Sequence, residues 1–254
     1  MTKAVVFLDI DDTIINRIQA TDDDIPVAFD ENGSPVGYMT TAQRWLLETL
    51  LHNAMVVPTT GRSLETFQRV RLPFDSFRIL SFGAIIIHPD GRMDEAWRYQ
   101  VMEKFRASSM AIRQWYRLAS MVVSDLALRE IRFLRYDQEE LIFIRGDIHE
   151  LSRLRDVMVN YENDHELNVA VHFDGHGLMV GPKNFGKEAA VRYLMETQDS
   201  IAKATRIGMG NALTDLPFMD LCHWCVMPSQ SHAWQKLRSD RGKIINGLID
   251  GEHR

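Results

Sequence analysis

The segment "VVFLDIDDT", residues 5–13, is the feature that most constrains the fold of this chain. Its first four residues are apolar and favour β structure, which predicts a strand covered on both faces; such strands occur mostly in parallel sheets of α/β proteins. Three carboxylates follow at Asp9, Asp11 and Asp12. In open α/β sheets the ligand site lies just beyond the carboxyl ends of the strands. Because like charges repel there, we expect a cation such as Mg²⁺ to join them; the alternative is a solvated acidic turn.

Composition excludes several classes of protein but selects no function. At 254 residues the chain is long enough for one large domain or two small ones. A net charge of -6 argues against nucleic acid as a partner, because binding a phosphate backbone needs a basic surface. The sequence contains no apolar run of membrane-spanning length and no secretory-signal pattern, so we expect no membrane partner and a cytoplasmic location. The oligomeric state is left open.

Strand and helix signals alternate over the first third of the chain. This alternation predicts a parallel sheet with crossover helices. The expected elements are a hairpin over residues 26–39, a helix over 40–54, a short strand in 55–63 that ends in polar residues and glycine, a short helix over 64–71 and a strand within 77–93. The hairpin is long for a connection, and we interpret it either as a flap beside the site or as an oligomer contact.

The middle of the chain has a different pattern, which predicts helix, hairpin, helix and hairpin in that order. We infer an α+β domain with an antiparallel sheet at residues 89–181, inserted into an α/β core formed by residues 1–88 and 182–254. The junctions are placed near His88–Pro89 and Gly181–Pro182, because insertions are tolerated at exposed loops.

The two cysteines, Cys222 and Cys225, have a C-x-x-C spacing that is compatible with a redox pair or a zinc site. Zinc would need further ligands at suitable spacing, and a redox pair would be expected at the start of a helix after an early strand. We therefore expect both to be small apolar core residues.

Four groups of polar residues follow predicted core strands. They are Asp9 with Asp11, Thr60 in "TTGR", Lys187 in "NFGKEAA", and Asn211 with Asp215 in "GMGNALTD". Taken singly, each has a simpler explanation as a turn, a helix cap or a solvated lysine. Taken in this order and in these strand contexts, they predict one site.

This order resembles the haloacid dehalogenase superfamily of phosphohydrolases. The first motif of that superfamily, Asp-x-Asp-x-Thr, matches Asp9 to Thr13; the second matches Thr60, the third Lys187, and the fourth the loop that ends at Asp215. The inserted α+β segment resembles the subclass of sucrose-phosphate, mannosyl-phosphoglycerate and Cof-like sugar phosphatases. The resemblance implies an α/β fold, a Rossmann-like parallel-sheet core with an inserted α+β cap domain.

Two parts of the match are less specific. The fourth motif usually reads Gly-Asp-x-x-Asn-Asp, and aligning Gly210 and Asp215 puts Asn211 at the first aspartate. Asparagine offers a carbonyl oxygen to Mg²⁺ but no charge, so we expect weaker metal binding, and loss of catalysis stays open. Lys183 lies just upstream of Lys187, so the sequence allows either lysine to match the third motif.

The resemblance implies that Asp9 attacks phosphorus and forms an aspartyl-phosphate. It implies that Asp11 protonates the leaving oxygen and later deprotonates water. Thr60 and Lys187 would bind the non-bridging phosphate oxygens. These four residues are the expected catalytic set.

The metal set expected for Mg²⁺ is Asp9, the backbone carbonyl of Asp11, and Asn211 or Asp215. Substrate contacts are expected from residues of both the core and the cap, namely Thr60, Arg62, Lys187, Asp174, His176 and Arg145. The implied function is magnesium-dependent hydrolysis of a small phosphorylated metabolite, and three classes stay open: a sugar phosphate, a glycosyl phosphoglycerate and a smaller phosphorylated metabolite. Two alternatives remain open: a phosphomutase similar to phosphomannomutases, and a catalytically silent relative that binds a phosphorylated ligand.

Overall fold

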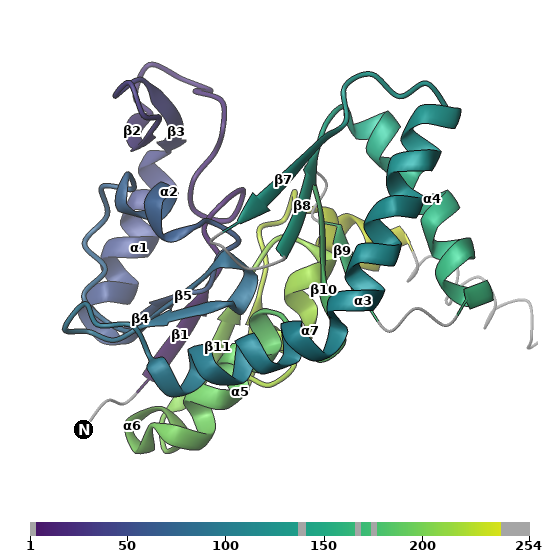
Figure 1. The fold of residues 1–254 in the computed structure, drawn as a ribbon. Coiled ribbons are helices and arrows are strands. Elements are labelled where there is room, and N and C mark those ends of the chain that lie inside the picture. The colour runs from purple at the N-terminus through teal and green to yellow at the C-terminus, as the bar shows by residue number, and fades with distance from the viewer. Residues whose placement is uncertain (1–3, 137–140, 166–168, 174–176, 240–254) are drawn as a thin grey trace, which may run out of the picture.

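The computed structural model describes residues 4–136, 141–165, 169–173 and 177–239. Within them a parallel sheet forms the core and an antiparallel sheet forms a cap (Figure 1). The strands are β1 (Ala4–Leu8), β2 (Ile25–Phe29), β3 (Pro35–Met39), β4 (Met55–Pro58), β5 (Arg78–Leu80), β6 (Ile85–Ile87), β7 (Arg132–Tyr136), β8 (Leu141–Arg145), β9 (Val169–Phe173), β10 (Gly177–Pro182), β11 (Thr205–Met209) and β12 (Trp224–Val226). The helices are α1 (Thr41–Asn53), α2 (Leu64–Gln68), α3 (Glu95–Asp125), α4 (Ile148–His165), α5 (Lys187–Thr197), α6 (Asp199–Ala202) and α7 (Leu216–Met219), with short 3-10 turns η1 (Ser81–Gly83) and η2 (Leu213–Asp215).

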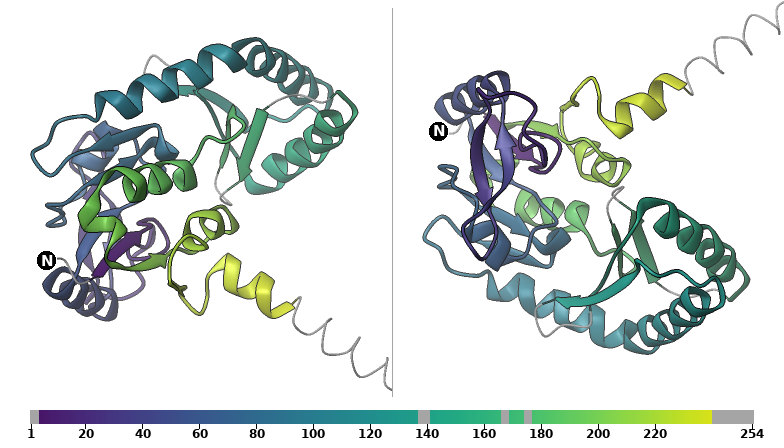
Figure 2. Two further views of the ribbon diagram at one scale, coloured as in Figure 1. Left: turned by 90° about the horizontal axis from the view of Figure 1, so that it is seen from below. Right: turned by 90° about the horizontal axis from the view of Figure 1, so that it is seen from above.

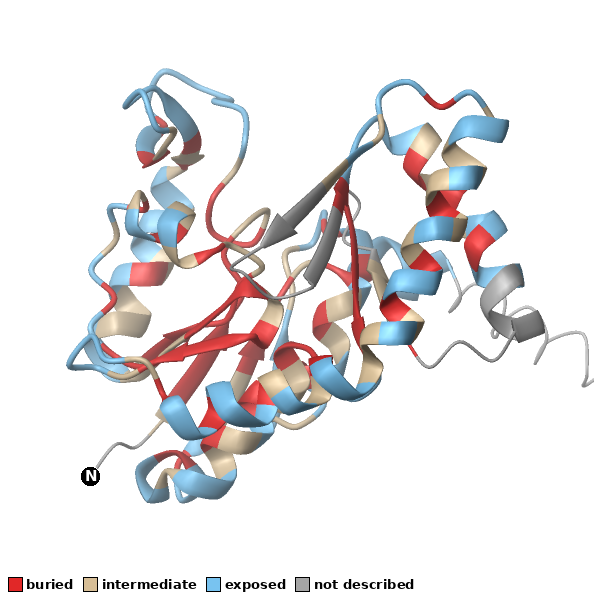
Figure 3. Ribbon diagram, in the orientation of Figure 1, coloured by how far each residue is buried: buried red, intermediate tan, exposed pale blue. Residues whose placement is uncertain are grey.

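The core sheet has the strand order β12-β11-β1-β4, and all its pairings are parallel. Residues 5–8 of β1 are completely buried, as expected for an inner strand covered on both faces. Figure 3 shows β4 largely buried beside it, whereas β11 is buried only in its last two residues, at the carboxyl end. The predicted α/β core with a parallel sheet is therefore confirmed.

The register of the core sheet brings its carboxyl ends to one edge. Leu8 pairs with Pro58 of β4 and with Met209 of β11. The next residues continue the ladder, since Asp9 N donates to Met209 O at 2.8 Å and Thr59 N donates to Leu8 O at 2.8 Å. The segments that follow β1, β4 and β11 therefore leave the sheet side by side.

The segment 77–93 differs from the single strand predicted for it. Two short antiparallel strands, β5 and β6, are joined by η1, in which Ser81, Phe82 and Gly83 all have positive φ. An apolar run does not reveal such a turn, because a left-handed backbone is rare for serine and phenylalanine. The turn predicted at residues 89–91 is present, with Gly91 N donating to His88 O at 2.9 Å.

The cap is an antiparallel sheet in the order β7-β8-β10-β9, with helices α3 and α4 on its outer side (Figure 2). The predicted order of helix, hairpin, helix and hairpin is confirmed. Asp147 begins α4 as expected, accepting hydrogen bonds from the backbone of His149 and Glu150. Pro182 still belongs to β10. The domain boundaries at 88/89 and 181/182 remain our proposal.

The predicted hairpin over residues 26–39 is present as β2 and β3. It is attached to the segment after α2, because Ala28 bridges Val70 and Arg71 N donates to Val27 O at 2.8 Å. Figure 1 shows the hairpin and the cap on the same side of the core, beyond the carboxyl ends of its strands.

The cysteine prediction is wrong for Cys225, which is exposed on the edge strand β12, and only partly right for Cys222, which is half-buried. An edge strand has no neighbour on one side, so its apolar residues gain less burial than those of β1. Burial raises the pKa of the Cys222 thiol to about 12, and it also raises the pKa of Cys225. Both are therefore protonated and weakly nucleophilic at neutral pH. None of the helices described is long and apolar enough to cross a membrane.

Candidate active site

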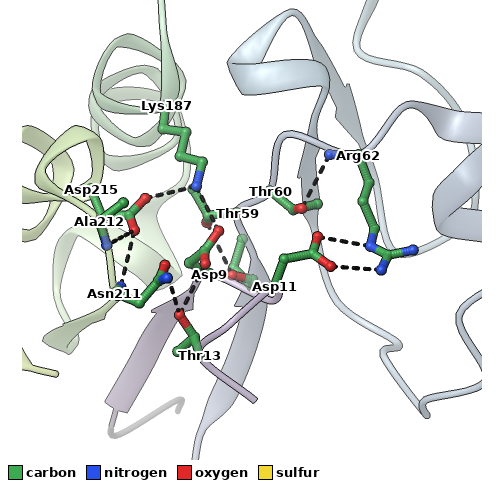
Figure 4. A network of polar contacts seen from close by, with 11 residues as sticks. Asp9, Asp11, Thr13, Thr59, Thr60, Arg62, Lys187, Asn211, Ala212 and Asp215 are labelled. Atoms are coloured by element: carbon green, nitrogen blue, oxygen red, sulfur yellow. Dashed lines mark hydrogen bonds and ion pairs between the residues drawn. The ribbon is translucent and has the colours of Figure 1, made fainter. Parts of the chain in front are cut away.

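Asp9 occupies the centre of a polar network at the carboxyl edge of the core sheet (Figure 4). It follows β1 directly and is 5% exposed. Its Oδ2 accepts a hydrogen bond of 2.9 Å from Thr13 Oγ1, and its Oδ1 accepts one of 2.6 Å from Lys187 Nζ. The Asp-x-Asp-x-Thr motif thus folds back so that its threonine orients its first aspartate.

Lys187 is the lysine that the fold brings to Asp9. It is the first residue of α5, after Gly186, whose φ of 142° is rare for other residues. Its ammonium also donates to Asp215 Oδ1 at 2.7 Å. Lys183 is exposed. The structure therefore distinguishes the two lysines that the sequence left in competition.

Asp215 is held between Lys187 and its own loop. Its Oδ2 accepts hydrogen bonds from the backbone N–H groups of Asn211 and Ala212, at 3.1 and 3.0 Å. Gly210 passes so close that any side chain there would collide with the Asp215 carboxylate. Both carboxylate oxygens therefore already have partners, and Asp215 organises the loop after β11.

Burial controls the charges of this cluster. It raises the pKa of the Asp9 carboxyl to about 7, with Lys187 opposing the shift and the negative charges of Asp215 and Asp11 adding to it. Burial disfavours the Lys187 ammonium, but Asp215 and Asp9 outweigh this and hold its pKa above the usual value. A further cation beside Asp9 would favour the ionised carboxylate, which is the form that acts as a nucleophile.

Asp11 lies beside this cluster but is turned toward Arg62. Arg62 Nε donates to Asp11 Oδ2 at 2.9 Å, and Arg62 Nη2 donates to Asp11 Oδ1 at 2.6 Å. This is the two-pronged pairing for which a guanidinium is suited. Thr60, which is completely buried, accepts a hydrogen bond from the Arg62 backbone at 3.1 Å through Oγ1. Its own O–H group can then donate to a ligand oxygen.

The left-handed turn Ser81–Gly83 connects the two sides of the site. Ser81 N donates to Arg62 O at 2.8 Å, and Phe82 N donates to Thr60 O at 3.1 Å. On the other side, Gly83 approaches Gly186 so closely that an added Cβ would overlap its carbonyl. Residues in this strained backbone region persist only where the surroundings enforce them. The turn therefore holds the Thr60 loop and the start of α5 at a defined separation.

A cavity of about 400 Å³ opens above these residues. All the predicted core residues of the site line it: Asp9, Asp11, Thr60, Arg62, Lys187, Asn211 and Asp215. Further lining residues were not predicted, and among them are Arg17, Phe29, Asp30, Val36, Arg69 and Phe82. Most of these come from the hairpin or the segments that flank it, and no motif in the sequence marks them.

The cap contributes Arg145 to the lining of this cavity. The other two cap residues expected to bind substrate, Asp174 and His176, lie outside the described residues.

The ligand atoms available to Mg²⁺ are oxygens of the expected type. Thr13 Oγ1 lies 2.9 Å from Asp9 Oδ2 and 3.4 Å from Asn211 Oδ1, so these two oxygens flank the same hydroxyl. Magnesium commonly binds one or two carboxylates and keeps several waters. Within the described residues, no three His, Cys, Asp or Glu side chains are grouped as a metal site. Asp9 and Asn211 offer oxygens that fit a magnesium ion, whereas the Asp215 carboxylate already has Lys187 and two backbone N–H groups as partners. The Asp11 carboxylate pairs with Arg62, which leaves its backbone carbonyl as the ligand expected from that residue.

The fold is similar to that of several solved phosphatases. The sucrose-phosphatase of Synechocystis sp. PCC6803, solved with sucrose and phosphate, superimposes with a TM-score of 0.57 at 17% identity, over 94% of this chain and 97% of that chain. A trehalose-6-phosphate phosphatase related protein gives a TM-score of 0.52 at 17% identity, over 97% of this chain and 99% of that chain.

An IMP-nucleotidase of Plasmodium falciparum, a mutant solved with bound IMP, gives a TM-score of 0.58 at 11% identity, over 96% of this chain and 68% of that chain. No family model and no curated protein sequence matches the chain. Identities this low show a common fold. The chain therefore shares with these phosphatases a Rossmann-like parallel-sheet core with a cap.

Proposed function

We propose that this protein is a phosphatase that hydrolyses a small phosphorylated metabolite, either a sugar phosphate or a glycosyl phosphoglycerate. One observation carries the proposal: Asp9 lies at the wall of the cavity, held on one oxygen by Thr13 and on the other by Lys187. A buried, oriented carboxylate beside a cation is suited to attack phosphorus and form an acyl phosphate.

In the first step an Asp9 carboxylate oxygen bonds to phosphorus while the bond from phosphorus to the ester oxygen breaks. Lys187 and the Thr60 hydroxyl stabilise the charge on the non-bridging oxygens. Lys187 is preorganised for this role, because its ammonium is already fixed between Asp9 and Asp215. In the second step water attacks the acyl phosphate and restores Asp9.

Asp11 supplies the proton that the leaving oxygen needs and later removes one from water. In the structure both of its oxygens accept hydrogen bonds from Arg62. Asp11 therefore has to leave Arg62 before it can contact a leaving group. A phosphoryl group that binds Arg62 would displace the Asp11 carboxylate from the guanidinium, because Arg pairs with phosphate in the same bidentate geometry.

Magnesium would be held by Asp9 and Asn211, and when bound it would neutralise charge on the phosphoryl group and on Asp9. Asn211 donates no negative charge to it. We therefore expect a higher magnesium requirement than a fully carboxylate site would have.

The hairpin of β2 and β3 is proposed as a flap. Phe29, Asp30 and Val36, all from the hairpin, line the same cavity as Asp9. A segment so placed can exclude water while the phosphoryl group is transferred. This lining supports the flap interpretation over an oligomer contact.

The decisive test is release of inorganic phosphate from a panel of sugar phosphates, glycerate phosphates and 4-nitrophenyl phosphate, over a magnesium titration. A phosphatase releases phosphate from at least one ester in a magnesium-dependent manner. With mannose 6-phosphate, a mutase would yield an isomer instead of phosphate. Binding without turnover of any ester would identify a silent ligand-binding relative and contradict the proposal.

A further inference from the structure

Three arginines line the outer part of the cavity, beyond the groups assigned to the phosphoryl site. Arg17 follows the first motif, Arg69 follows α2, and Arg145 ends β8 of the cap. They come from separate segments of the chain but line one cavity with Asp9.

Arg69 is the best placed of the three. Its carbonyl oxygen accepts a hydrogen bond of 3.2 Å from Phe29 N, which fixes its backbone to the base of the hairpin. Its Nη1 donates to Glu65 Oε1 at 2.9 Å. Its Nε is buried and has no hydrogen-bond partner among the described residues. In this orientation the Arg69 guanidinium therefore has one buried N–H group without a hydrogen-bond partner among the described residues.

An unpaired buried N–H on a charged group is unfavourable, and such groups in folded proteins usually mark a missing ligand or water. The ion pair with Glu65 compensates little for this unpaired N–H group. Glu65 is 76% exposed, and an ion pair to so exposed a carboxylate contributes little. Arg69 therefore loses almost nothing when it turns from Glu65 to an anion in the cavity.

Two further carboxylates that line the cavity, Asp30 and Asp12, have partners of their own. Asp30 Oδ1 accepts hydrogen bonds from the backbone of Asn32 and Ser34, at 2.9 and 2.8 Å, and so belongs to the hairpin turn. Asp12 lies on the side of Arg17, at 3.7 Å. The Asp30 carboxylate is thus held by its own turn and not by Arg69.

We propose that the leaving group of the substrate carries a second anionic group, a carboxylate or a second phosphate, and that Arg69 binds it. This inference rests on the proposed function, since it names the class of ester that the same site hydrolyses. The cavity of about 400 Å³ accommodates a small metabolite with its two anionic groups at opposite ends. Arg69 is then a specificity-determining residue.

Two matched substrate pairs test this. 3-Phosphoglycerate and glycerol 3-phosphate differ only in a carboxylate against a hydroxymethyl group. Glucose 1,6-bisphosphate and glucose 6-phosphate differ in a second phosphate. We expect the wild-type protein to prefer the anionic member of at least one pair by about tenfold or more in kcat/KM, as charged hydrogen bonds allow. A preference for 3-phosphoglycerate would identify the anion as a carboxylate. A preference for glucose 1,6-bisphosphate would identify it as a second phosphate.

The variant Arg69→Met should remove most of this preference through KM, and should leave 4-nitrophenyl phosphate hydrolysis unchanged. Arg69→Lys should retain part of it. Arg44→Met is the matched control, because Arg44 also pairs with an exposed glutamate one helical turn away, Glu48, but does not line the cavity. The control should preserve the preference in full.

Equal kcat/KM values within both pairs would overturn the proposal, and so would a preference that survives Arg69→Met. If no ester, including 4-nitrophenyl phosphate, is hydrolysed, then the proposed function fails, and calorimetry decides the inference separately. Tighter binding of 3-phosphoglycerate or glucose 1,6-bisphosphate than of its neutral partner, lost in Arg69→Met, would support the anion site. Equal affinities would reject it.

Discussion

The inner and outer parts of the cavity are built in different ways. In the inner part, Asp9, Thr60, Lys187 and Asp215 are buried and have short hydrogen bonds to one another or to backbone groups. In the outer part the lining comes from the β2–β3 hairpin and from arginines whose ion pairs are exposed or long, such as the Arg69 pair with Glu65.

Under the proposed function, this difference separates the groups expected to perform the chemistry from those expected to determine selectivity. Asp9, Thr60 and Asp215 follow strands of the core sheet and Lys187 begins α5, so the positions of the inner groups are determined by the backbone ladder and by burial. The outer groups lie on the β2–β3 hairpin, at the end of β8 and in the segments after β1 and α2, closer to the surface, where change is better tolerated. Changes in the inner part should therefore affect all esters, and changes in the outer part should affect only some of them or only the rate of turnover.

The largest effect is expected for Asp9→Asn, which tests whether the inner part performs the chemistry. A carboxamide is a poor nucleophile, so phosphate release from every ester should fall by at least about 10⁴-fold. Rapid-quench measurement should find no protein-bound phosphate. Asp12→Asn is the control, since asparagine tolerates the same left-handed backbone, φ 58°, and its activity should change little. A burst of bound phosphate from Asp9→Asn would reassign the nucleophile.

The loss of turnover in Asp11→Asn should depend on how readily the leaving group of the ester departs. Sugar esters leave poorly without a proton, so their turnover should fall by about 10²–10⁴-fold. 4-Nitrophenyl phosphate leaves without that proton, and the phosphorylated protein should accumulate because the base for its hydrolysis is missing. Rapid-quench measurement of turnover and of protein-bound phosphate checks both expectations. An equal loss with both kinds of ester would show that Asp11 is not the acid.

Lys187→Met tests whether the inner part also depends on its charges for stability. The change leaves Asp9 and Asp215 buried without their common cation, which should cost about 3–5 kcal/mol in the free energy of unfolding. Urea denaturation measures it. Lys183→Met is the matched control, because Lys183 is exposed, and its unfolding curve should match that of the wild type. Similar curves for both variants would mean that the ammonium does not hold the two carboxylates.

The smallest effect is expected in the outer part, at the tip of the hairpin. Replacing Asp30–Ser34 with Asn-Gly keeps a turn suited to two paired strands and removes a segment that is mostly exposed. Turnover should fall by up to about tenfold as water enters the site, with an unchanged melting temperature. Full activity together with a smaller oligomer on size-exclusion chromatography would instead identify the hairpin as a contact between copies.

Much of the inner site was predictable from the sequence because of how parallel strands end. Asp9, Thr60 and Asn211 each follow an apolar run, and parallel strands in one sheet end at the same edge. Their order along the chain was therefore enough to bring them together. The hairpin and the order of the cap elements were also predictable, since turn residues and apolar periodicity are local signals.

Other features depended on contacts between segments that are distant in the sequence. Lys183 and Lys187 are equivalent as residue types, and only the start of α5 after Gly186 directs one of them to Asp9. The pairing of Asp11 with Arg62 has no signal at either position, because it depends on where two side chains meet in space.

The sequence by itself determined the strands, their polar ends and hence the type of chemistry. The tertiary structure decided which lysine reaches Asp9, the left-handed turn at Ser81–Gly83 that holds the Thr60 loop against α5, and the position of Arg69 beside the cavity. The physical reason is that apolar periodicity and the ends of strands depend on residues that are close together in the sequence. The direction of a long charged side chain is set by whatever packs around it, which comes from elsewhere in the chain.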